Sequence, residues 1–156
     1  MSCFLLLSPT AAFAEDGNNT AKDLGWVSIG SGVLANVPFV AYNRVKRYSV
    51  VKLGGGHEIT RSMAMQHSPI MTFHMGLNLI GFAAGAVHGI IFLNRLDMFS
   101  LSLAILMTAL TTSGVILRFT KSTDAKLLTR MFHGQIVLSG LLAVLIVLHV
   151  ITAYED

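Results

Sequence analysis

Four histidines in strongly apolar surroundings are the side chains best suited to chemistry. His74 and His88 enclose thirteen uncharged residues, and His133 and His149 lie in a second apolar stretch near the C-terminus. Ionisable side chains inside a membrane are costly to bury and are usually functional. A neutral imidazole is also the most common metal ligand among side chains. The pattern therefore predicts metal or proton chemistry within a bilayer.

The spacing of the first two histidines places both imidazoles on one face of a helix. His74 and His88 are 14 residues apart, which is a rise of about 21 Å and falls about 40° short of a whole number of turns. Gly81 lies midway on the same strip and forms a small-residue ridge with Gly85 and Gly89. Such a ridge either lets another helix approach closely or leaves room for a flat ligand. The sequence leaves both alternatives open for Gly81.

The composition indicates that a membrane surrounds these residues. Of the 156 residues, 53% are hydrophobic and only 12% are charged. A spanning helix needs about 20 apolar residues. Four segments meet this requirement: 24–43, 70–94, 98–118 and 131–153. The second starts directly after Pro69, which we expect to mark a helix start. We therefore expect an all-α membrane protein in which residues 15–156 form a four-helix transmembrane bundle.

The basic residues predict how these helices cross the membrane. Nine of the eleven lysines and arginines fall in loops 44–69 and 118–130, and only Lys22 and Arg95 lie on the other side. Because cytoplasmic loops carry the positive excess, we expect both termini outside. Residues 1–14 end in an A-x-A pattern and are predicted to be a signal peptide. The expected location is an inner or plasma membrane, or an energy-transducing organelle membrane.

Alternating topology makes the second and fourth helices parallel, so the histidines sort by depth. His74 and His133 lie toward the cytoplasmic face, whereas His88 and His149 lie toward the outer face. Because no carboxylate lies at these depths and the pairs are about 20 Å apart, two haems with two histidine ligands each explain the pattern better than two zinc ions. The one cysteine, Cys3, lies in the predicted signal peptide, which excludes covalently attached haem.

A family resemblance rests on the H-x13-H spacing, the second histidine pair and the run RMFHGQIVLSGLLAVLIVLHV. Together these resemble the di-haem b-type membrane cytochromes, a group that includes cytochrome b561-like, ferric-reductase-like and bc-type cytochrome b four-helix cores. The resemblance covers residues 70–153. It implies that His74, His88, His133 and His149 ligate two non-covalent b haems, and that electrons cross between a quinone or soluble donor and an acceptor.

The spacing of the second pair departs from this pattern. His133 and His149 are 16 residues apart, which leaves them about 160° apart on a regular helix. A π-bulge between Gly134 and Gly140, or an irregular first turn, would bring His133 to the shared face. Alternatively, Met131, which is 18 residues from His149, is the inner ligand, or the protein holds a single haem.

The expected binding partners follow from the arginines near the histidines and from the motifs that the chain lacks. Arg118 and Arg130 are expected either to pair with propionates of the inner haem or only to set the topology. The small chain has no flavin or nucleotide motif, so we expect an electron-transfer subunit of a larger oxidoreductase. Its partners would be membrane lipid, a quinone and other redox subunits, with no nucleic acid. The alternatives are a haem-free anchor or assembly subunit and a histidine proton relay, which the lack of a partner carboxylate disfavours.

Overall fold

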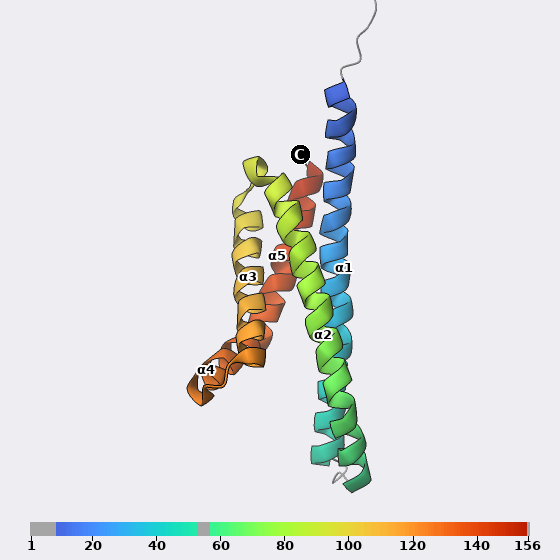
Figure 1. Ribbon diagram of the computed structural model, residues 1–156, viewed down its shortest axis with the longest axis vertical. Helices are drawn as coiled ribbons and strands as arrows, with labels where there is room; N and C mark the ends of the chain where they lie inside the picture. Colours follow the sequence, from blue (N-terminus) through green and yellow to red (C-terminus); the bar gives the residue numbers. More distant parts are fainter. Residues whose placement is uncertain (1–8, 53–56, 156) are drawn as a thin grey trace, which may run out of the picture.

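The computed structural model describes residues 9–52 and 57–155, and in that part of the chain the protein is all-α, with no strand. Four of the described helices are long and apolar enough to cross a membrane, which confirms the predicted fold class. The elements, labelled as in Figure 1, are α1 Pro9–Lys52, α2 His57–Ile91, the short 3-10 helix η1 Leu93–Arg95, α3 Met98–Phe119, α4 Thr123–His133 and α5 Ile136–Glu155. The spans lie in α1, α2, α3 and α5.

The first two helices form a long antiparallel pair that extends beyond the lower ends of α3 and α5 in Figure 1. The second helix begins at His57, so the prediction that Pro69 marks its start is wrong. A proline inside a helix removes one backbone hydrogen bond. α2 continues through Pro69 while it packs against α1, and the Tyr42 hydroxyl donates to the backbone carbonyl of Met63 before the proline.

The predicted helix 131–153 is interrupted, so its description as one element is wrong. α4 ends at His133, and α5 begins at Ile136. The N–H of Gly134 bonds to carbonyls of the preceding turn and closes α4. A Cβ on Gly134 would lie 2.9 Å from the Arg130 carbonyl oxygen, which explains why a glycine occupies this turn. The break lets α4 project sideways at the lower end while α5 runs beside α3.

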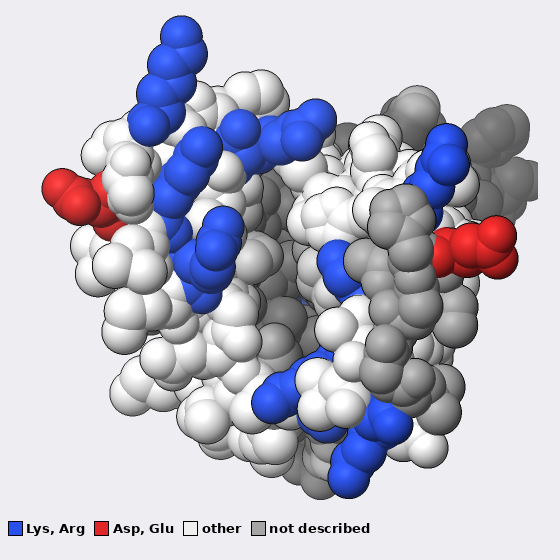
Figure 2. Space-filling model, turned by 90° about the horizontal axis from the view of Figure 1, so that it is seen from below, with Lys and Arg blue, Asp and Glu red and all other residues white. Residues whose placement is uncertain are grey.

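The positions of the two ends of the described chain agree with four crossings of the membrane. α1 begins and α5 ends at the same end of the bundle in Figure 1, whereas the end of α1, the start of α2 and the connection from α3 to α4 lie at the other end. Figure 2 views that other end and shows lysine and arginine side chains on both sides of a hollow. Residues 1–8 of the predicted signal peptide lie outside the described residues, and residues 9–14 belong to α1. Cleavage after residue 14 stays a prediction.

The surface of the spans is apolar. Val37, Leu79, Ile105 and Val144 are each more than half exposed in the isolated chain. Side chains of this kind face lipid tails without cost, whereas the backbone polar groups are satisfied within the helices. The protein is therefore a multi-pass membrane protein, in contact with membrane lipid along these faces.

Candidate functional site

The structure brings the four membrane histidines into two pairs. His74 of α2 faces His133 at the end of α4, with ring centroids 6.5 Å apart and an interplanar angle of 84°. His88 of α2 faces His149 of α5, with centroids 6.0 Å apart and an angle of 86°. We call His74 and His133 the inner pair, and His88 and His149 the outer pair. The partners within each pair come from the same depth of the bundle, although they belong to different helices.

Helix α1 holds both imidazoles of α2 through their Nδ1 atoms. The Nδ1 atom of His88 lies 2.7 Å from the Ala21 carbonyl oxygen, and that of His74 lies 3.3 Å from the Ala35 carbonyl oxygen. A carbonyl can only accept, so the short contact at His88 puts the proton on Nδ1. Nδ1 of His74 also lies 3.3 Å from the side-chain amide nitrogen of Asn78. The two alanines are almost fully buried and are 14 residues apart, as the two histidines are. One helix therefore supplies two acceptors in register with two imidazoles.

Helix α3 holds the other two imidazoles through serine hydroxyls. Ser100 Oγ lies 2.9 Å from Nδ1 of His149, and Ser113 Oγ lies 2.9 Å from Nδ1 of His133. His133 Nδ1 is also 3.0 Å from the Leu110 carbonyl oxygen. Metal-ligating histidines almost always use their second nitrogen in this way, since such a bond fixes the tautomer and the orientation of the ring.

The other ring nitrogen, Nε2, is available in these histidines. Among the residues that the structure describes, Nε2 of His88, His133 and His149 has no hydrogen-bond partner. Nε2 of His74 has one long contact of 3.5 Å, with the side-chain amide nitrogen of Asn78. An imidazole protonated on Nδ1 has its lone pair on Nε2, which is the form that binds a metal.

Two glycines lie directly against the imidazoles. A Cβ on Gly25 would come 3.2 Å from Cε1 of His88, and a Cβ on Gly114 would come 3.1 Å from Cε1 of His133. Carbon atoms in favourable contact are about 3.5–4.0 Å apart, so any larger residue would crowd the ring. Neither glycine can be recognised from the sequence, because nothing in their spacing separates them from the other twelve glycines of the chain.

The glycine ridge of α2 contacts α1. A Cβ on Gly81 would lie 2.6 Å from Ser31 Oγ, and one on Gly85 would lie 2.8 Å from Ser28 Oγ, whereas Gly89 has no such neighbour within 4 Å. Of the two alternatives left open by the sequence, close helix packing accounts for the position of Gly81. The expected role of Gly81 beside a cofactor stays a prediction.

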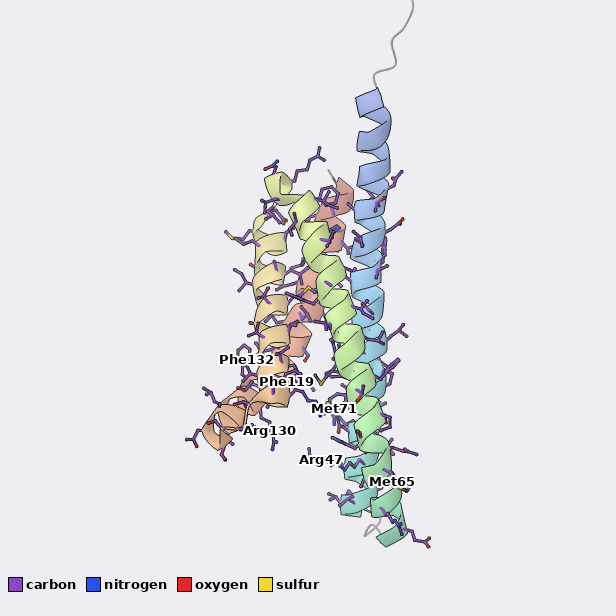
Figure 3. The ribbon with its side chains drawn as sticks, viewed as in Figure 1. Arg47, Met65, Met71, Phe119, Arg130 and Phe132 are labelled. Atoms are coloured by element: carbon purple, nitrogen blue, oxygen red, sulfur yellow. The ribbon has the colours of Figure 1, made fainter. Side chains whose placement is uncertain are left out.

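The remaining predicted residues lie at the basic end. In Figure 3, Arg130 of α4 and Arg47 of α1 lie on opposite sides of the gap between α4 and the α1–α2 pair. Arg118 lies in the last turn of α3 and is exposed. Met131 is 62% exposed, whereas His133 faces His74. The geometry therefore favours His133 over Met131 as the residue that partners His74.

The donor set restricts which metal could be held. Across residues 9–52 and 57–155, no group of three or more His, Cys, Asp or Glu side chains could hold a metal ion. A zinc site takes four protein ligands, or three and a water. Two neighbouring imidazoles would instead suit an iron that brings its other four ligands with it, as haem iron does.

No family model, curated protein or solved structure matches the chain. Its function therefore has to be argued from the geometry of these residues.

Proposed function

We propose that the protein is a b-type membrane cytochrome subunit with two haems, one held by His74 and His133 and the other by His88 and His149. The distance between the paired rings carries the proposal. A bond from imidazole nitrogen to a metal such as zinc is about 2.1 Å, and ring bonds of about 1.33 Å put the ring centre about 1.1 Å beyond the nitrogen. Two imidazoles that held one metal between them would therefore have centres about 6.4 Å apart, and the observed separations are 6.5 and 6.0 Å.

The protonation pattern supports the same conclusion. Every one of the four rings is anchored through Nδ1, either to a backbone carbonyl of α1 or to a serine of α3. A proton relay would exchange protons through both ring nitrogens, whereas Nε2 of His88, His133 and His149 has no hydrogen-bond partner among the described residues. A ring anchored through Nδ1 with an available Nε2 is what ligation of a haem iron would require.

Position in the membrane determines what two such sites could do. His74 and His88 are separated by about 21 Å of helix rise, which is most of the hydrocarbon thickness of about 30 Å. Haem supplies one-electron chemistry when it is bound. The chain's own residues orient the two sites at different depths and surround them with apolar spans. Two sites so placed connect a donor at one face, such as a quinone or another redox subunit, with an acceptor at the other.

Alanine variants of the individual histidines test the proposal. His88→Ala and His149→Ala should each lower the haem-to-protein ratio from two to one by removing the outer haem, and His74→Ala and His133→Ala should remove only the inner one. His67→Ala is the matched control, because His67 lies on α2 outside both pairs, with its ring 6.2 Å from that of Tyr42. A ratio that stays at two in His88→Ala would contradict the proposed ligation.

A further inference from the structure

At the outer pair, a serine connects one imidazole to a carboxylate. Ser100 Oγ lies 2.9 Å from Nδ1 of His149. The backbone N–H of Ser100 donates to Oδ1 of Asp97 at 2.7 Å, and the Ser100 side chain helps to lower the pKa of this carboxyl group. The Nδ1–H of His149 can therefore donate to Ser100 Oγ while the serine hydroxyl donates to Asp97. A charged group thus lies next to the serine that contacts Nδ1 of His149.

The carboxyl group of Asp97 keeps its charge at neutral pH. The hydrogen bonds from the side chain and the backbone of Ser100 hold the pKa of Asp97 below its usual value. In the described part of the chain, no lysine or arginine forms an ion pair with Asp97. Asp97 is also the N-cap of α3, where the helix dipole favours a negative charge.

The inner pair has a serine in the equivalent place but no carboxylate behind it. Ser113 Oγ lies 2.9 Å from Nδ1 of His133. The Ser113 hydroxyl donates to the backbone carbonyl of Leu110 at 2.7 Å, and that carbonyl also lies within 3.0 Å of Nδ1 of His133. A neutral acceptor therefore ends the hydrogen-bond chain at the inner pair, where an anion ends it at the outer pair.

We infer that Asp97, acting through Ser100, is a positioning residue that lowers the reduction potential of the outer haem. This inference rests on the proposed ligation by His149. A hydrogen bond from Nδ1–H toward an anion raises the basicity of the ligand and so stabilises the oxidised iron. Hydrogen bonding around the axial ligand is one of the means by which a protein adjusts the potential of a haem. The two pairs would thus differ in potential although both consist of two histidines.

Asp97→Asn is the informative substitution because it removes the charge and keeps the cap. Asparagine caps a helix about as well as aspartate, so the start of α3 is preserved. The midpoint potential is measured by spectroelectrochemistry of the full chain in the His133→Ala background, where only the outer haem is expected. We expect the ratio of reduced to oxidised haem at a fixed potential to rise about tenfold, which is about 59 mV for a one-electron couple.

Three further variants separate the hydrogen-bond chain from a general effect of charge. Asp97→Glu should retain a potential near that of the parent protein. Ser100→Ala should raise the potential, and adding Asp97→Asn to it should change little, since the connection is already broken. In the His88→Ala background, where only the inner haem is expected, Asp97→Asn should leave the potential unchanged.

Three other outcomes would overturn the inference, and each shows which step of it is wrong. If Asp97→Asn leaves the outer potential unchanged, the carboxylate has no influence through Ser100, although the haem ligation stands. If both haems shift by the same amount, the charge acts at a distance and not through His149. If the wild-type protein binds no haem, the proposed function fails and this inference fails with it.

Discussion

Gly114→Ala should weaken the inner haem site selectively. The new Cβ would lie 3.1 Å from Cε1 of His133, about half an ångström closer than a favourable contact between carbon atoms. The ring cannot retreat without stretching the bonds from its Nδ1 atom to Ser113 and Leu110, which are 2.9 and 3.0 Å long. A preorganised site tolerates displacements of only about 0.5 Å.

The size of the effect follows from that displacement. Loss of a group that orients a metal ligand typically costs about 10–100-fold in affinity, so the inner haem should bind about 10–100-fold more weakly, which is about 1.4–2.7 kcal/mol. The outer haem should bind as before. Helix propensity acts in the opposite direction, because alanine favours a helix by about 1 kcal/mol relative to glycine. The haem-free protein should therefore not be destabilised through its backbone.

The assay is a titration of the purified haem-free chain with haem, followed by the absorbance of the bound form. Gly140→Ala in α5 is the control, since a Cβ there would meet no atom within 4 Å, and it should bind two haems with unchanged affinity. If Gly114→Ala binds both haems as tightly as the parent protein, His133 is not held against α3 in the way that we describe.

Three further predictions concern the outer site, the inner ligand and the topology. Gly25→Ala should weaken the outer haem alone, because its Cβ would crowd His88, and a loss of the inner haem instead would refute the assignment. His133→Ala should abolish the inner haem while Met131→Ala leaves the haem content unchanged, and the reverse result would assign the ligand to Met131. A cysteine at position 124 should react with a membrane-impermeant maleimide only in opened cells, since the basic loops are expected inside, and labelling of intact cells would contradict that orientation.

The number and type of the spans could be predicted because they depend on local composition. Each span contains about 20 residues with few charges, a property that the sequence displays directly. The helix ends depend on contacts between helices. Pro69 is a local stop signal, yet α2 continues through it where it packs against α1. That the basic residues between the first two spans extend α1 and α2 as helix could not be read from hydropathy.

The register of His133 was the least predictable feature of the candidate site. A regular helix would have turned His133 away from the face of His149, and the sequence left a bulge, an irregular turn and Met131 as alternatives. The chain instead stops at Gly134 and starts a new helix at Ile136. This break frees His133 from the register of α5, so the 160° discrepancy no longer applies.

The groups that anchor the imidazoles were not predictable from the sequence. Ala21 and Ala35 act through backbone carbonyls, and any residue has one. Ser100 and Ser113 are ordinary helix residues whose side chains reach the histidines only because of the rotation of α3 about its axis. That rotation is determined by packing between helices, for which one sequence gives no direct signal.

A pyridine haemochrome assay on the wild-type protein, purified from haem-sufficient cells and related to protein concentration, tests the central claim most directly. Two opposed histidine pairs at two depths predict two non-covalent haem b groups per chain, with a b-type reduced-minus-oxidised spectrum. One haem per chain would contradict the inner site. A correctly folded, colourless protein would contradict the account as a whole.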